Sequence, residues 1–242
     1  MWRLLETEWM KWRRSRMWLL LMTLPVLSIL IGSANYALNQ EVLRKEWYSL
    51  WSQVSLFYGE FFLPVLIAIA CSHLCRLEHA NKSWRNLLTA PIAVSRIYLS
   101  KLAVLAWHML LVQVVFFFLY LCAGKLLSLS APPPKEILGW MVRGWIASVT
   151  LGTIHLWLSM RIRSFAVPVG IGLCGVFVGL GMVVKDWGLF FPYSLLTVGM
   201  GVLSQEGLTP AELLWFLAAN FLYAILFSAL SLRRLKRPEG LV

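Results

Sequence analysis

The sequence predicts an all-α integral membrane protein with six transmembrane helices in a single domain, residues 1–242. Three observations lead to this fold class. Of the 242 residues, 60% are hydrophobic and only 14% are charged, and the mean hydropathy is +0.73. Several stretches without charge are long enough to cross about 30 Å of hydrocarbon. The basic residues alternate between dense and sparse segments, as loops on the two sides of a membrane do.

The N-terminal segment, residues 1–16, has the pattern of an interfacial helix. Trp2, Leu5, Trp9 and Trp12 fall on one helical face, and five basic residues supply the polar remainder. Tryptophan prefers the headgroup boundary and basic side chains prefer anionic lipid, so we expect this helix to lie along the inner leaflet. A simple positive-inside anchor is the alternative. Because the segment is long and charged, it does not fit a cleavable signal peptide.

The stretches poor in charge place the six spans at about 17–38, 50–75, 102–124, 140–160, 164–184 and 212–232. With both termini in the cytosol, the outer segments hold only six of the 22 basic residues, namely Arg44, Lys45, Lys125, Lys135, Arg143 and Lys185. The positive-inside rule therefore predicts cytosolic termini. The net charge of +11 then indicates contact with anionic membrane lipid and not with nucleic acid.

Residues 187–205 are also uncharged but do not read as a seventh span. Gly188, Pro192, Gly199 and Gly201 interrupt them, and a further crossing would put the basic C-terminal segment outside. We expect a re-entrant segment or short outer helices here, which are tolerated only where other parts of the protein shield their backbone.

The start of the last span has its own signal. Thr209, Pro210 and Glu212 have the order of a helix cap, a first helical residue and a capping-box acid. This pattern predicts that the sixth helix begins at Thr209–Pro210.

The sequence lacks the common motifs of ATPases, zinc proteases and serine hydrolases. It has no G-x-x-x-x-G-K-[ST] loop, no H-E-x-x-H and no G-x-S-x-G, so we expect no ATP hydrolysis, no catalytic residue and no cofactor bound by this chain. Cys71, Cys75 and His79 recur at intervals of four, with His73 between them. This is not a usual structural-zinc spacing, and we predict no metal site.

Glu60 is an acidic residue within the second span. Such residues are costly in a bilayer and tend to face a protein interior or a wet cavity, so we predict that Glu60 lies on the substrate pathway. The alternative is a position near the outer end of the span, within reach of water or of Arg44 and Lys45.

The fifth span is rich in glycine. Gly170, Gly172 and Gly175 match G-x-G-x-x-G on paper, but they lie in a hydrophobic span with no preceding strand, which excludes a nucleotide site. With Gly179 they form a surface of small residues where another helix can approach closely. We expect helix packing within the chain or across a dimer, and a flexible gating helix is the alternative.

The segment 76–101, between the second and third spans, is charged and amphipathic. Trp84, Leu87 and Leu88 fall on one face of a short helix that Pro91 ends. A surface helix between two spans can transmit a push from a cytosolic partner. An ordinary loop helix resting on lipid is the alternative.

This segment resembles the type-2 ABC exporter permeases of the lantibiotic-immunity and bacitracin-resistance branch. The residues that carry the resemblance are Glu78-His79, Trp84-Arg85-Asn86-Leu87-Leu88, Ala90-Pro91-Ile92 and Ile97-Tyr98-Leu99-Ser100-Lys101. Arg85 stands where the pattern more often has lysine, and the charge is kept. The likeness extends to the N-terminal Glu8-x-x-Lys11 and to Phe191-Pro192-Tyr193 after the fifth span.

The resemblance implies a permease in the bacterial cell membrane that pairs with two separate ABC ATPase subunits, which bind ATP and Mg²⁺, and with a second permease copy or a related permease. Residues 1–16 would be the elbow helix, and Glu78–Ala90 would be the coupling helix. The coupling residues that it implies are Glu78, His79, Lys82, Trp84, Arg85, Leu87 and Leu88. We therefore expect an exporter that confers immunity to a lantibiotic or another amphipathic peptide antibiotic. Export of a drug, an ion or a lipid, and a non-transporting anchor or sensor for an ATPase, are the alternatives.

Overall fold

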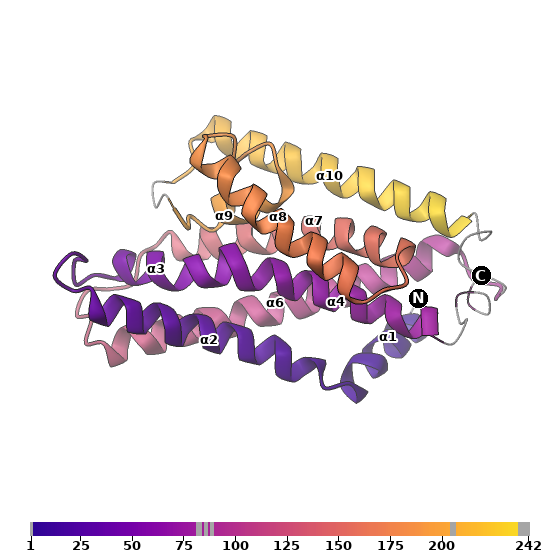
Figure 1. Ribbon diagram of the computed structural model, residues 1–242, viewed down its shortest axis with the longest axis horizontal. Coiled ribbons are helices and arrows are strands. Elements are labelled where there is room, and N and C mark those ends of the chain that lie inside the picture. Colours follow the sequence, from indigo (N-terminus) through magenta and orange to yellow (C-terminus); the bar gives the residue numbers. More distant parts are fainter. Residues whose placement is uncertain (1, 81–83, 85–86, 88–89, 204–206, 237–242) are drawn as a thin grey trace.

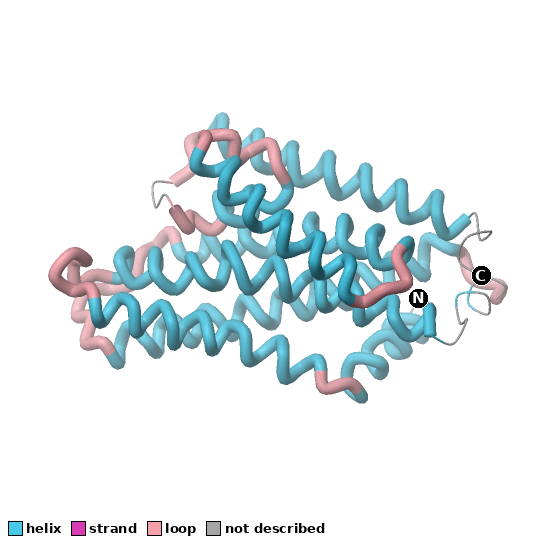
Figure 2. Tube along the Cα trace, viewed as in Figure 1, coloured by secondary structure: helices cyan, strands magenta, loops and turns pink. Residues whose placement is uncertain are grey.

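The protein is a bundle of long helices that run roughly side by side (Figure 1). The structure, a computed structural model, describes residues 2–80, 84, 87, 90–203 and 207–236. These residues form helices joined by loops, without a strand among them (Figure 2). Six helices in this part of the chain are long and apolar enough to cross a membrane, as the sequence predicts.

The six candidate spans each overlap one predicted span, and most run longer than predicted. In chain order the elements are α1 (Trp2–Arg14), α2 (Met17–Leu38), α3 (Trp47–Ser55), η1 (Leu56–Phe62), α4 (Leu63–Ala80), α6 (Val94–Leu126), α7 (Ile137–Arg161), α8 (Ala166–Val184), α9 (Pro192–Gly199) and α10 (Pro210–Lys236). The second span is the continuous helix formed by α3, η1 and α4.

The interior of the bundle lies around α4 and α7. Helix α7 packs against α4, α6, α9 and α10, and both α4 and α7 bury most of their length. Helices α2, α8 and α10 lie at the periphery and expose large apolar side chains such as Leu30, Phe177 and Phe221. An apolar side chain on a membrane protein's outer face meets lipid and needs no protein partner. The exposed faces therefore fit a bundle surrounded by hydrocarbon.

A π-helical turn, η1, interrupts the second span near its middle. It covers the seven residues Leu56–Phe62 and contains Glu60. A π-helix takes more residues per turn than an α-helix and occurs mostly as a single turn, often at a functional site. The wider turn changes the helical register between α3 and α4, so Glu60 turns toward the bundle interior and is buried.

One short helix, α9, lies between the fifth and sixth spans and is buried inside the bundle. The sequence predicts a re-entrant segment or short outer helices here, and the described residues contain one such helix. Its C-terminal end is held by two side chains: Trp51 Nε1 donates to the Met200 carbonyl at 3.1 Å, and Arg143 Nε donates to the Gly199 carbonyl at 3.0 Å. The expected shielding of its backbone is therefore present.

Helix α10 begins with the predicted capping box. The Thr209 backbone N–H donates to Glu212 Oε2 at 2.8 Å, and the Glu212 N–H donates to Thr209 Oγ1 at 3.3 Å. Pro210 is its first residue. The reciprocal bonds satisfy backbone donors that a helix start leaves unpaired.

Helix α1 and the C-terminal end of α10 lie at the same end of the bundle (Figure 1). The loops that follow α2 and α6 lie at the opposite end. This arrangement suits the prediction that both termini face one side of the membrane. Which side they face stays a prediction.

Candidate functional site

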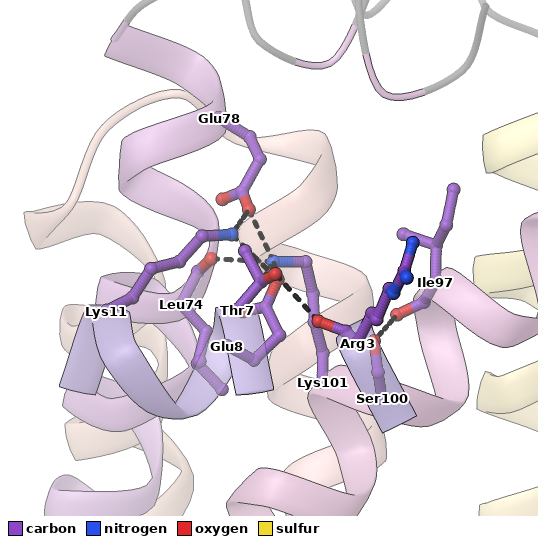
Figure 3. Close-up of polar contacts among 9 residues, drawn as sticks. All are labelled: Arg3, Thr7, Glu8, Lys11, Leu74, Glu78, Ile97, Ser100 and Lys101. Atoms are coloured by element: carbon purple, nitrogen blue, oxygen red, sulfur yellow. Dashed lines mark hydrogen bonds and ion pairs between the residues drawn. The ribbon is translucent and has the colours of Figure 1, made fainter. Parts of the chain in front are cut away.

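Four charged side chains meet near the end of the bundle where α1 lies, and we call them the charged clamp: Glu8, Lys11, Glu78 and Lys101 (Figure 3). Glu8 and Lys11 belong to α1, Glu78 to α4 and Lys101 to α6. The four form a closed ring of ion pairs. Lys11 Nζ lies 2.7 Å from Glu8 Oε1 and 2.7 Å from Glu78 Oε1. Lys101 Nζ lies 2.6 Å from Glu78 Oε1 and 3.1 Å from Glu8 Oε1.

Lys101 is fully buried, with 0% of its surface exposed. Its ammonium group has an acceptor for each of its three N–H donors. Besides the two carboxylates, Nζ donates to the Leu74 carbonyl of α4 at 3.0 Å. It also lies 5.7 Å from the centre of the Trp84 ring, within the range of a cation–π contact. A buried ammonium is tolerated only when it is paired and hydrogen-bonded. The clamp meets both conditions.

Aromatic rings dock α1 beside the charged clamp. The Trp12 ring stacks on the ring of His108 of α6, with centroids 4.1 Å apart, and contacts His73 of α4 at 6.0 Å. Trp9 also contacts His108, at 5.1 Å. Trp12 is buried, whereas Trp9 stays partly exposed. The tryptophans that the sequence assigns to a lipid-facing stripe therefore divide their contacts between the bundle and its surroundings.

The predicted coupling residues fall into two groups. Glu78, His79, Trp84 and Leu87 are described, while Lys82, Arg85 and Leu88 lie outside the described residues. Glu78 and Trp84 are almost fully buried. His79 Nε2 pairs with the Ser159 carbonyl of α7 at 2.8 Å, and its ring contacts the Trp84 ring at 5.9 Å.

Because Glu78 and Trp84 face the bundle, neither presents its side chain to a docking partner. Both contact Lys101 of α6, and the neighbouring His79 contacts the Ser159 carbonyl of α7. The role of Glu78 and Trp84 in coupling to an ATPase stays a prediction. Because both side chains are buried, we expect them to support the segment and not to contact the ATPase directly.

Glu60 lies inside the bundle, in the π-helical turn η1, and is only 2% exposed. The Thr197 hydroxyl of α9 donates a hydrogen bond to Glu60 Oε2. No ion pair to Glu60 occurs among the described residues, so Arg44 and Lys45 are not its partners there. The alternative of a position open to water at the outer end of the span does not fit this burial. A place on the substrate pathway stays a prediction.

The glycines of α8 face different surroundings. A Cβ on Gly172 would lie 3.0 Å from the Ala68 Cβ, and one on Gly179 would lie 3.0 Å from the Tyr193 Cβ. A Cβ on Gly175 would overlap the Tyr193 ring, whose hydroxyl pairs with His155 Nε2 at 2.8 Å. Gly170 faces open space among the described residues. Three of the four predicted packing glycines thus contact the chain's own interior, and Gly170 does not.

The thiols and imidazoles do not gather into a metal centre. Among the described residues, no group of three or more His, Cys, Asp or Glu side chains is placed to hold a metal ion. Cys71 and Cys75 are buried free thiols, and Cys71 Sγ lies 3.5 Å from the Gly152 carbonyl.

Comparison with known proteins decides the family. The family model described as "ABC-2 family transporter protein" matches residues 4–179, which is most of the chain. The chain belongs to the ABC-2 transporter family. A comparison with curated proteins finds no match.

An ABC-2 permease is the membrane subunit of an ABC transporter and works with a separate ABC ATPase. The matched region begins inside α1 and ends inside α8, and so includes the charged clamp and Glu60. The family and the six apolar helices together make this chain a multi-pass membrane protein.

The sequence of this ABC-2 permease identifies Glu78 as a candidate coupling residue but indicates no role for Glu8, Lys11 or Lys101. Each of these three is a charged residue in a segment that reads as cytosolic, where charge usually indicates a solvated face. One signal does distinguish Lys101. It lies one residue before a stretch without charge, on a helix that continues without a break into the span. A lysine at that depth must pair or reach the interface.

Proposed function

We propose that this ABC-2 permease is the membrane subunit of an ATP-driven exporter that protects its host cell against a lantibiotic or another membrane-active peptide antibiotic. The resemblance of the segment 76–101 to the lantibiotic-immunity and bacitracin-resistance branch supports this substrate class. In the proposed assembly two permeases, either two copies or two related chains, join two ATPases that bind ATP and Mg²⁺. Both termini face the cytosol in the bacterial cell membrane.

The mechanism that we propose is a push on the coupling segment. ATP-driven closure of the two ATPases moves the segment 76–101, and the two permease halves rock against each other. The substrate then passes from the bilayer to the outer side, provided that it binds the two states with different affinity. Glu60, buried within the span, is the polar group that we assign to the substrate pathway.

One observation carries this proposal: the root of the coupling segment is fixed to the spans. Glu78 pairs with Lys101 of α6 at 2.6 Å, and His79 pairs with α7 through the Ser159 carbonyl. A segment tied to two spans at its base passes on a displacement, whereas a loosely attached loop absorbs it. A non-transporting anchor has no need of such attachment.

The test is a protection assay in a sensitive bacterium. Cells that express the permease together with its ATPase are challenged with a lantibiotic and, separately, with bacitracin. We expect the inhibitory concentration of at least one of them to rise at least fourfold, and we expect the rise to vanish when the ATPase carries an inactivating substitution. Export of another substrate predicts no rise with either antibiotic.

Glu60→Gln separates transport from anchoring. The amide keeps an acceptor for the Thr197 hydroxyl, so the fold should persist, but the side chain can no longer ionise. A transporter with Glu60 on its pathway loses protection while the permease still copurifies with its ATPase. An anchor retains every function with this substitution. Thr197→Val, which removes the donor and keeps the carboxylate, is the matched control for a merely structural effect.

A further inference from the structure

The charged clamp connects elements that are far apart in the sequence. Glu8 and Lys101 are 93 residues apart, and Lys11 and Glu78 are 67 apart. Lys101 alone reaches α1 through Glu8, α4 through Glu78 and the Leu74 carbonyl, and the coupling segment through the Trp84 ring. It is therefore the common contact of the elbow helix, the second span, the third span and the coupling segment.

We infer that Lys101 is a positioning residue, which fixes the elbow helix α1 and the root of the coupling segment in one register on α6 so that they move as a single unit. This inference rests on the proposed function, because it names the part that carries the push into the spans. It gives a role to Glu8, Lys11 and Lys101, which are not among the coupling residues that the resemblance implies.

The geometry of the ammonium group supports positioning. A lysine ammonium has three N–H donors, and here the acceptors are Glu8, Glu78 and the Leu74 carbonyl, at 3.1, 2.6 and 3.0 Å. The acceptors belong to two different helices, and the donors point in fixed directions. A rotation of α1 relative to α4 would break at least one of these bonds. Apolar packing alone does not set the orientation of α1 in this way.

The charge balance shows why four groups are used. The clamp has two positive and two negative charges, and each half is neutral by itself: Glu8 with Lys11 on α1, and Glu78 with Lys101 on α4 and α6. Replacing buried ions by apolar residues is often neutral or stabilising, so a buried ion network is weak evidence for a role in stability. A role in setting register accounts for a buried network that stability alone does not require.

The separable halves provide a test that leaves no unpaired buried charge. The double variant Glu8→Gln/Lys11→Gln removes the neutral pair of α1 and keeps the Glu78–Lys101 pair, so the protein should fold and insert. The matched control is Glu6→Gln/Arg13→Gln, which removes one acid and one base from exposed positions of the same helix.

Two variants of Lys101 complete the set. Lys101→Arg tests rescue by a conservative change, and Lys101→Met removes the central cation.

The first measurement is structural and does not depend on any substrate. Leu5 of α1 and Val104 of α6 line the same groove. In a chain whose native cysteines are replaced by alanine, Leu5→Cys and Val104→Cys are joined with a short thiol cross-linker in membranes that contain the whole complex. We expect the cross-link yield to fall at least fivefold in Glu8→Gln/Lys11→Gln and to stay unchanged in the exposed control. If the cross-link yield is unchanged in both double variants, the inference that the charged clamp fixes the position of α1 is wrong.

The second measurement is the protection assay with bacitracin and a lantibiotic, read together with ATP turnover and with the amount of complex in the membrane. We expect Glu8→Gln/Lys11→Gln and Lys101→Met to lose at least fourfold in protection per complex while ATP turnover continues, and Lys101→Arg to recover most of it. A purely structural role would lower the amount of complex and leave protection per complex unchanged, which also overturns the inference.

The two proposals fail in different ways. If the unaltered complex protects against neither antibiotic, the proposed function is wrong, and the cross-link yield still decides whether the clamp holds α1. If the unaltered complex protects and both clamp variants protect equally well per complex, the proposed function stands and the positioning role is wrong.

Discussion

Single residues of α8 show how two helices of the bundle pack closely. Tyr193 of α9 lies against Gly175 and Gly179, and its hydroxyl reaches His155 of α7. The missing side chains on α8 thus make room for an aromatic ring that links α9 to α7. Gly170 and Gly181 lie on the same helix and face open space among the described residues. The helix therefore offers an internal comparison between glycines that are in contact and glycines that are not.

We predict that Gly175→Ala destabilises the protein, because the new methyl group would overlap the Tyr193 ring. Overpacking of this kind costs about 1–3 kcal/mol. The measurement is a denaturant titration of the purified permease in detergent. Gly181→Ala is the control and should leave the free energy of unfolding unchanged or slightly higher, since alanine favours a helix over glycine. Equal effects of the two substitutions would contradict the packing role of Gly175.

The glycine pattern illustrates what the sequence can and cannot predict about residues. Spacing alone indicates a close approach at Gly175 and Gly179. It does not name Tyr193 as the partner, because that depends on where the chain folds α9 back into the bundle. The charged clamp is similar. Glu8 and Lys101 each look like members of a polar face, and only the docking of α1 on α6 makes them a buried pair.

At the scale of whole elements, α9 is a helix of eight residues whose stability depends on its neighbours. Isolated helices of this length are marginal in water, and their unpaired terminal carbonyls are costly inside a membrane. Trp51 and Arg143 donate to two of these carbonyls, at Met200 and Gly199. The element therefore persists because α3 and α7 supply the donors that it lacks.

We predict that Arg143→Met loosens α9. The substitution keeps an unbranched side chain and removes the charged donor to the Gly199 carbonyl, a bond worth about 1.5–3 kcal/mol. Hydrogen exchange of the backbone amides in 193–200 should become at least tenfold faster. Lys135→Met, a change at an exposed position in the loop before α7, should leave these amides protected. If α9 exchanges at the same rate in both variants, Arg143 does not hold it.

Elements differ in how well the sequence predicts them. The start of α10 follows from local chemistry, because Thr209, Pro210 and Glu212 satisfy the helix start among themselves. Local signals of this kind do not depend on the rest of the fold. The π-helical turn η1 has no such signal, since its extra residue per turn is set by packing of the second span against α2 and α9. The burial of Glu60 depends on that packing and could not be read from spacing.

At the scale of the molecule, the six candidate spans and the positions of the loops define two ends of the bundle. The loop 127–136, between α6 and α7, lies at one end. The loop 162–165, between α7 and α8, lies at the other, together with α1 and the last residues of α10 (Figure 1). Dense basic charge at the second end favours the cytosol for it. The predicted membrane orientation rests on this difference in charge, and it would place an ATPase at the second end.

Labelling of single cysteines tests that orientation. In a chain whose native cysteines are replaced by alanine, we predict that a maleimide that cannot cross membranes labels Lys135→Cys in intact cells and does not label Ser164→Cys. Both positions are exposed and flank α7 at opposite ends, so they differ in side and not in access. Permeabilised cells should label both, which shows that each thiol can react. The reverse pattern would place α1, the charged clamp and the coupling segment outside the cell, where no ATP-driven subunit could push on them.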